Sequence, residues 1–386
     1  MTTATASSVR DAVAAYAVRM HRVLGDDHHV ASPFGAWLVL ALTAPAARGK
    51  TAERLAEMLG MPLEDAATVA RELLAAPPEA VAAAAAAWSG PAAGDAAVWL
   101  DGLPEQVARG PVPTQAQADA WARENTMGLI ETFPLDMARD WSVVLASALA
   151  TRIAWHTAFD VVGAGELRSD WRERVRSVLR TPREGHHAAI VRHRDAGDLA
   201  IHQAYADGLT VTSVIAGPDV PAVDVLAAAH DVATGSVPHV SLFDLPAGDG
   251  PSWTITESDG DNRSETVAAL LPAWSARSEH DLTRPGLGFK DAAAVLMTLF
   301  PSDGSWDARQ SAMARYHRRG FEAAAVTALA VARISLRIPQ AGRRRDALLR
   351  FDRPYAVVAT VTGGDWHGLP VFSAWVTEPE EPSEED

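Results

Sequence analysis

Apolar residues recur with the period of an α-helix over the first sixty positions of the chain. An apolar stretch at Ser32–Leu42 opens with Ser-Pro, which suits the first turn of a helix. Lys50–Leu59 is a short amphipathic segment closed by Gly60. Residues 8–23 carry one apolar face, made of Val9, Val13, Tyr16, Ala17 and Met20. Three helices are therefore predicted near the N-terminus.

The next part of the chain changes from helical to strand-like patterns. The alanine-rich residues 64–88 are predicted to be helical, and so are residues 114–132, with Trp121 on the inner face. Trp141–Trp155 is predicted to form a buried strand.

Strand patterns dominate the remainder of the chain. Ala188–Ala216 is β-like, and Leu209–Ile215 within it alternates apolar and polar residues. Ala247–Ser264 is rich in Gly, Asp and Ser and is expected to be a long surface loop. Further strands are predicted at Ala323–Leu336, Ala356–Val361 and Leu369–Val376. Helices first and strands later indicate an α+β architecture.

The length and the ends of the chain suggest its domain organisation. A chain of 386 residues can bury one large core, and we find neither an internal repeat nor a clear linker. We therefore expect one domain over residues 1–379, followed by an acidic tail over residues 380–386. The N-terminus lacks the pattern of a secretory signal, and no apolar stretch is long enough to span a bilayer. A cytoplasmic protein without membrane contact is expected.

Composition limits the chemistry. The formal net charge of −15 makes nucleic acid a poor partner. Cysteine is absent, which excludes disulfides, thiolate zinc sites and a cysteine nucleophile. The pairs His28-His29 and His186-His187 would point to opposite faces of a strand, so we expect no metal and no cofactor. Twelve tryptophans leave open a pocket for a small hydrophobic ligand.

Several stretches, in chain order, resemble segments of the serpin family. They are Ala31–Phe34 (ASPF) with Ala46–Ala52 (AARGKTA), Trp121–Ile130 (WARENTMGLI), Ser147–Asp160 (SALATRIAWHTAFD), Leu271–Leu282 (LPAWSARSEHDL), Gly320–Thr327 (GFEAAAVT), Phe351–Tyr355 (FDRPY) and Val371–Pro379 (VFSAWVTEP). The chain resembles a divergent, bacterial member of that family. The resemblance implies a monomer with helices around a large central mixed β-sheet, smaller sheets and an exposed reactive loop.

The resemblance also implies a mechanism, that of a suicide-substrate inhibitor of a serine (or cysteine) protease. The protease cleaves the loop, and the hinge before the cleaved bond inserts into the central sheet. The hinge would comprise Gly320, Phe321, Glu322, Ala323, Ala324, Ala325, Val326 and Thr327, with Phe321, Ala323, Ala325 and Thr327 facing inward. By the family's spacing the scissile bond would be Ile334–Ser335, or Arg333–Ile334 in a register shifted by one residue. Arg337 is a third candidate.

Some positions depart from the family pattern. Phe321 replaces a small polar residue, and a bulky ring entering a strand gap costs about 1–3 kcal/mol. The acidic residue that is usual before the hinge is replaced by Arg318-Arg319. In the sheet-opening region, which comprises Ser32, Gly35, Ser147, Gln310 and Trp155, three polar family residues are replaced, by Gly35, Ser147 and Gln310. These departures favour an alternative, a non-inhibitory serpin-fold protein that binds a ligand, acts as a chaperone module or has been recruited for small-molecule enzymatic chemistry.

Overall fold

The predicted N-terminal helices are present in the computed structural model, which describes residues 3–235, 237–260, 262–300, 306–321 and 342–383. Helices α1 (Thr3–Leu24), α2 (Pro33–Thr43) and α3 (Gly49–Leu59) follow one another. The Ser32 hydroxyl caps α2 by accepting the Gly35 N–H at 3.3 Å. Gly60 ends α3 with φ +70°, a conformation that glycine adopts without strain.

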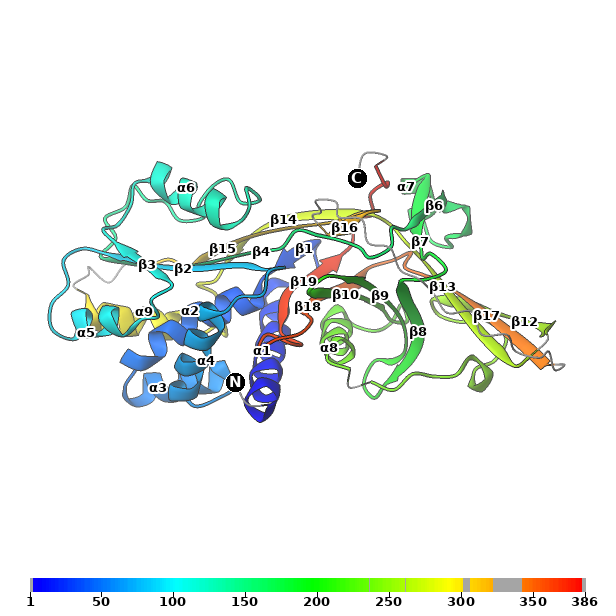
Figure 1. The fold of residues 1–386 in the computed structure, drawn as a ribbon, viewed down its shortest axis with the longest axis horizontal. Helices are drawn as coiled ribbons and strands as arrows, with labels where there is room; N and C mark the ends of the chain where they lie inside the picture. Colours follow the sequence, from blue (N-terminus) through cyan, green and yellow to red (C-terminus); the bar gives the residue numbers. More distant parts are fainter. Residues whose placement is uncertain (1–2, 236, 261, 301–305, 322–341, 384–386) are drawn as a thin grey trace.

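Six further α-helices lie in the described residues. They are α4 (Leu63–Ala75), α5 (Asp95–Gly102), α6 (Gln115–Asn125), α7 (Trp171–Arg174), α8 (Ala222–Ala233) and α9 (Phe289–Leu299). Figure 1 shows α2, α3, α4 and α9 gathered on one face of the strands β2, β4 and β15, and α6 on the opposite face. No helix in these residues is long and apolar enough to cross a membrane.

Two sheets lie edge to edge along the top of the view in Figure 1. One contains β3 (Val107–Gly110), β2 (Ala82–Ser89) and β4 (Val143–Ala150), with β2 parallel to β3 and antiparallel to β4. The other contains β14 (Trp274–Asp281), β15 (Arg309–Tyr316), β16 (Gly320–Phe321) and β5 (Ile153–Ala154), all antiparallel. The chain passes from the first sheet to the second within three residues, because β5 follows β4 directly.

Two six-stranded sheets form the rest of the molecule. The first has the order β1 (His29–Ala31), β19 (Pro370–Val376), β18 (Tyr355–Val361), β10 (Leu209–Ile215), β9 (Gly197–Ala206), β8 (His186–His193). The second has the order β11 (Gly248–Asp249), β12 (Trp253–Gly260), β17 (Gly342–Arg350), β13 (Ser264–Leu271), β7 (Ser177–Arg180), β6 (Asp160–Gly163). Both faces of β10, β18 and β19 are buried, which accounts for their near-continuous apolar sequences. The α+β architecture is confirmed.

The prediction of a helix over residues 64–88 is wrong in its second half. Helix α4 ends at Ala75, and the alanine run forms strand β2, which pairs with a neighbour on each side. Alanine is the best helix former, but a central strand gains two ladders of backbone hydrogen bonds and close packing of small side chains. The tertiary pairing outweighs the local preference.

The prediction of a surface loop over residues 247–264 is also wrong. Strand β12 occupies residues 253–260 and pairs with β17 over its whole length. Trp253 and Ile255 are buried, whereas the residues beyond them are mostly exposed, so the strand leaves the core part-way along. Ser258, Asp259 and Gly260 lie in the exposed half of β12, in an arm that β12 forms with β17 and β13, seen at the right of Figure 1.

The acidic tail is held to the body of the molecule at its first two residues. The Glu380 N–H donates to the Ala273 carbonyl at 2.7 Å, and the Glu380 carboxylate accepts the Ser275 hydroxyl at 2.5 Å. The Glu381 carboxylate accepts the Arg176 N–H at 2.8 Å. These bonds extend the ordered part of the chain beyond residue 379.

Candidate functional site

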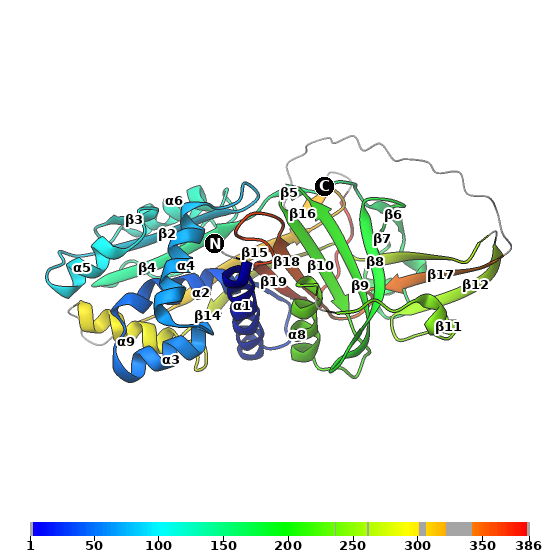
Figure 2. The ribbon, with the colours of Figure 1, turned by 60° about the horizontal axis from the view of Figure 1, so that its bottom comes forward.

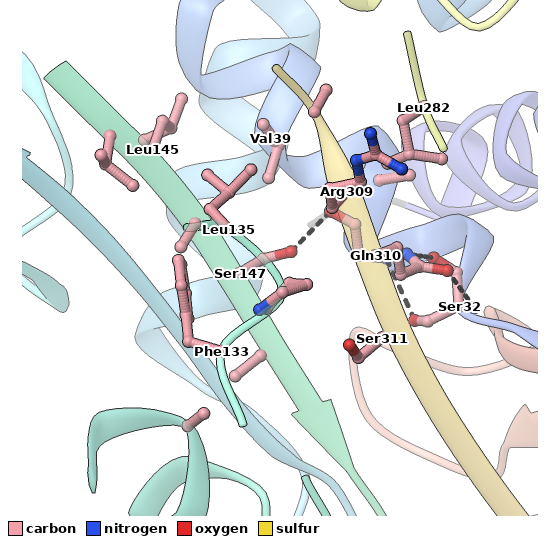
Figure 3. A pocket seen from close by; sticks show the side chains of 18 of the residues that line it. Ser32, Val39, Phe133, Leu135, Leu145, Ser147, Leu282, Arg309, Gln310 and Ser311 are labelled. Atoms are coloured by element: carbon pink, nitrogen blue, oxygen red, sulfur yellow. Dashed lines mark hydrogen bonds between the residues drawn. The ribbon is translucent and has the colours of Figure 1, made fainter. Parts of the chain in front are cut away.

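A long cavity of about 570 Å³ lies where the two edge-to-edge sheets meet, between β4 and β15. In the described residues these two strands are not paired with each other. Residues of α2 and α9 form the floor of the cavity, and the loop after α6 contributes Phe133 and Leu135 from the other side (Figure 3). The lining includes residues 143–150 of β4 and residues 309–314 of β15, so the cavity extends along both strands, where a further strand would fit between them.

The strands on either side of the gap are each tied to the start of α2. The Ser147 hydroxyl on β4 donates to the Gly35 carbonyl at 2.8 Å. The Gln310 side chain on β15 donates to the Ser32 carbonyl at 2.9 Å and accepts the Ser32 N–H at 3.0 Å. Ser32 also donates its hydroxyl to the Val371 carbonyl at 2.9 Å. Ser32, Gly35, Ser147 and Gln310 therefore come together, and the residues that depart from the family pattern still form a hydrogen-bonded cluster. Figure 3 shows Ser32, Ser147 and Gln310.

Replacing Gln310 by alanine is expected to lower the free energy of unfolding by about 2 kcal/mol, because it leaves the Ser32 N–H and carbonyl without their side-chain partner. Urea denaturation would measure the change. Ser311→Ala is the matched control, since Ser311 is the adjacent residue and lies on the opposite face of β15. An equal loss in both variants would contradict a specific link between Gln310 and Ser32.

Phe321 closes the gap at the end where β16 lies between β15 and β5, which is called the upper end below. It pairs with Tyr316 of β15 on one side and with Ile153 of β5 on the other, and its side chain is only 3% exposed. Its ring centre lies 6.3 Å from that of Trp274. Phe321 faces inward, and its ring is already part of the core. The free-energy cost of packing this ring into the sheet is therefore included in the folding of the intact protein. A later insertion of the residues after Phe321 would not have to meet it again.

Trp155 lies at this upper end, away from the Ser32 cluster. Its N–H donates to the Arg319 carbonyl and its indole N–H to the His317 carbonyl, both at 2.9 Å. The Phe159 N–H donates to the Arg318 carbonyl at 3.0 Å. The backbone of residues 317–319, which leads into β16, is thus fixed by the segment after β5.

A buried chain of hydrogen bonds supports the same end of β15. His186 Nε2 lies 2.7 Å from the Thr157 carbonyl and must donate to it, so its Nδ1 accepts from His202 Nε2 at 3.0 Å. His202 Nδ1 then accepts the Tyr316 hydroxyl at 3.4 Å. Burial lowers the pKa of both histidines and raises that of Tyr316, which keeps the chain neutral. The sequence did not indicate this chain, because its members lie up to 159 positions apart.

Part of the predicted site lies outside the described residues. This applies to the hinge from Glu322 to Thr327, namely Glu322, Ala323, Ala324, Ala325, Val326 and Thr327, and to Arg333, Ile334, Ser335 and Arg337. Gly320 and Phe321 are the hinge residues that the structure places, both in β16. Within the described ranges no three His, Asp or Glu side chains form a group that could hold a metal ion.

The fold is similar to that of solved serpin structures. Serpin48 from the insect Tenebrio molitor aligns with a TM-score of 0.61 and 16% identity, over 97% of this chain and 99% of that one. The thermophilic serpin Tengpin in its native state gives 0.65 and 13%, over 95% and 93%. A thyroxine-binding globulin in complex with thyroxine gives 0.64 and 12%, over 97% and 100%. No family model and no curated protein matches the chain by sequence. The likeness shows a serpin fold.

Proposed function

We propose that this chain, which has the fold of a serpin, is a serpin-type endopeptidase inhibitor that traps a serine (or cysteine) protease by inserting its cleaved loop between β4 and β15. The observation that carries the proposal is the unpaired gap between these strands, closed at its upper end by Phe321. The polypeptide leaves β16 at Phe321, and β16 already lies between β15 and the continuation of β4.

The register of β16 supports insertion into this gap. Phe321 is opposite Tyr316 and Ile153, and an antiparallel strand continued from there without a bulge would place Thr327 opposite Gln310 and Ser147. Both of these side chains point toward α2 (Figure 3). A strand with this register would fill the gap from Phe321 down to the polar cluster at Ser32.

The side chains that this register turns inward are small. Directly opposite residues of antiparallel strands share a face, so Ala323 and Ala325 would face α2 together with Ala314 and Ala312 of β15. Ala324 would face outward with Met313. The hinge therefore meets the steric requirement of a strand that has to slide into an existing sheet.

The two described ends of the loop lie far apart. Phe321 is in the middle of the molecule, whereas Gly342, the first residue of β17, pairs with Gly260 at the tip of the arm (Figure 2). In the intact chain both ends are paired, so full insertion without a cut would have to break the pairing of β17 with its neighbours. Cutting the loop would remove this constraint, which supports a mechanism in which cleavage triggers insertion.

The experiment is to incubate the protein with trypsin-, elastase- and subtilisin-like proteases and to separate the products on a denaturing gel. In the proposed reaction the protease serine hydroxyl attacks the carbonyl of Arg333 or Ile334, the amine of the next residue leaves, and insertion preserves the acyl ester. An SDS-stable complex is expected. Arg333→Ala should abolish the complex with the trypsin-like enzyme if Arg333 is the cleaved residue. Quantitative cleavage without any stable complex would overturn the proposal.

A non-inhibitory, ligand-binding role is the second candidate. It is supported by the predominantly apolar lining of the 570 Å³ cavity and by the structural likeness to a thyroxine-binding globulin. In that case a small hydrophobic molecule would occupy the gap and stabilise the intact protein, and cleavage would produce no complex. The same gel, run beside a melting curve with an environment-sensitive hydrophobic dye, distinguishes the two roles.

A further inference from the structure

A second cavity, of about 190 Å³, shares no lining residue with the gap and is lined by three arginines and by Asp352. Arg350 ends β17, Arg353 follows it in the loop to β18, and Arg168 lies just before α7. The turn between β11 and β12, Gly250–Ser252, closes the cavity. The segments are far apart in sequence, so only the fold brings the three guanidinium groups together.

Arg168 and Arg353 are fixed in place and have acidic partners. Arg168 donates to the Asp249 carboxylate at 2.5 Å and to the Thr254 hydroxyl at 2.7 Å. Arg353 donates to the Pro251 carbonyl at 3.0 Å and lies 3.6 Å from the Asp352 carboxylate. These two charges are therefore balanced locally.

Arg350 has no such balance. Its side chain donates to the Glu166 carbonyl at 2.6 Å, the Thr254 hydroxyl at 2.9 Å and the Leu348 carbonyl at 3.2 Å, all of which are neutral acceptors. Among the described residues no carboxylate forms an ion pair with it, and the residue is only 8% exposed. A buried charge without a counter-ion is costly, so a guanidinium in this state points to an anion that is bound from outside.

The surroundings of Arg350 fit this interpretation. Burial is the main cause that lowers its pKa, and the positive charge of Arg168 acts in the same direction. The carboxylates of Asp352, Glu166 and Asp249 oppose it from a distance. An anion inside the cavity would lie against the guanidinium of Arg350, the one arginine here without a paired carboxylate, with Arg168 and Arg353 beside it. A guanidinium binds oxyanions in a bidentate geometry.

We propose that the cavity lined by Arg168, Arg350 and Arg353 binds a small oxyanion, such as inorganic phosphate or sulfate or the carboxylate of a small acid. Its volume accepts a group of a few non-hydrogen atoms and excludes a larger polyanion from full entry. The bound anion supplies the countercharge of Arg350 and joins the end of β17 to the turn before β12. The site is independent of the gap between β4 and β15.

Titration calorimetry of the intact protein with sodium phosphate, sodium sulfate and sodium acetate, at ionic strength held constant with sodium chloride, tests the proposal and separates the three sources. A dissociation constant below about 1 mM for at least one anion is expected. With 20 mM of that anion present, linkage predicts a rise in Tm of about 2 °C above the chloride reference. The absence of binding heat for all three anions would overturn the proposal.

Two variants locate the site. Arg350→Gln is expected to lose the binding and the specific rise in Tm, whereas Arg344→Gln, an exposed residue of the same strand that pairs with Asp346, should keep both. Because sulfate also stabilises proteins by exclusion from their surfaces, the quantity that decides is the difference between the two variants. If Arg350→Gln does not fold, Arg168→Gln takes its place and should weaken binding at least tenfold. Equal binding by all variants would contradict the assignment.

Discussion

Cleavage within residues 333–335 is expected to raise Tm by about 10 °C or more. The estimate comes from the volume of the gap that the inserted strand would fill. Filling a cavity of about 570 Å³ contributes on the order of 10 kcal/mol. A chain of 386 residues has an unfolding entropy of about 0.8 kcal/mol per kelvin, which converts this free energy to on the order of 10 °C. New backbone hydrogen bonds to β4 and β15 add to the gain.

Differential scanning calorimetry of the intact and cleaved protein measures this gain, and two arginine variants test its cause. Ala325→Arg puts a charge at a position that the register turns toward α2, so its cleaved form should gain little. Ala324→Arg, one residue earlier, would face outward beside Met313 and should retain the gain. Loss in both variants, or retention in both, would contradict the register. An unchanged Tm in the cleaved native protein would favour the non-inhibitory role.

Acid is expected to destabilise the protein strongly between pH 7 and pH 4. His21, His29, His230 and His280 come together from α1, β1, α8 and β14, and all four are buried. His21 Nδ1 donates to His29 Nε2 at 2.8 Å, because His29 Nδ1 must donate to the Asp27 carbonyl. Neither ring nitrogen of His230 has a partner among the described residues. Burial and these hydrogen bonds therefore favour the neutral form of the histidine rings over the protonated form.

The direction of the effect follows from the pKa values. Burial lowers the pKa of His29 and of His230 to about 4, whereas the unfolded chain titrates near the ordinary value of about 6.5. As the pH falls through this interval the unfolded state takes up protons and the folded state does not, so stability is complete above pH 6.5 and decreases toward pH 4. Each of these residues accounts for about 3 kcal/mol of the loss. His21, whose pKa burial also lowers, adds to it.

Urea denaturation at several pH values between 7.5 and 4 would measure this loss. His230→Leu removes a ring without hydrogen-bond partners and should make the pH dependence shallower by about 3 kcal/mol over the interval. His367→Gln, at an exposed position, should leave the dependence unchanged and serves as the control. The same pH dependence in His230→Leu and in the native protein would show that this ring is not involved.

Patterns of apolar residues predicted the first three helices well, because the backbone hydrogen bonds of a helix and its start and stop signals lie within its own sequence. The apolar face of α1 and the Ser-Pro start of α2 are local signals, and both elements are where the periodicity places them. Strand β2 and the β12–β17 arm depend on partners elsewhere in the chain. Neither the alanine run of β2 nor the polar residues of β12 carries information about those partners.

The candidate site was predictable to the extent that it lies in stretches that resemble the family. Ser32, Gly35, Ser147 and Gln310 were singled out by their positions in such stretches, and the fold brings them together. The sequence could not show that the Gln310 amide satisfies both the donor and the acceptor of Ser32, because this depends on side-chain geometry. It also gave no sign of Arg350, whose lack of a counter-ion becomes apparent only in three dimensions.

The absence of pairing between β4 and β15 has a mechanical consequence. In the described part of the chain the β3–β2–β4 sheet has no backbone hydrogen bonds to β15. A movement of this sheet away from β15 therefore breaks no backbone hydrogen bond between these two strands. Its middle strand presents alanine methyl groups to the neighbouring helices, a smooth surface with little interdigitation to resist shear. The bonds of Ser147 and Gln310 to α2 are then the interactions that resist this movement. Strand β5, which pairs with β16, is the point about which the sheet would turn.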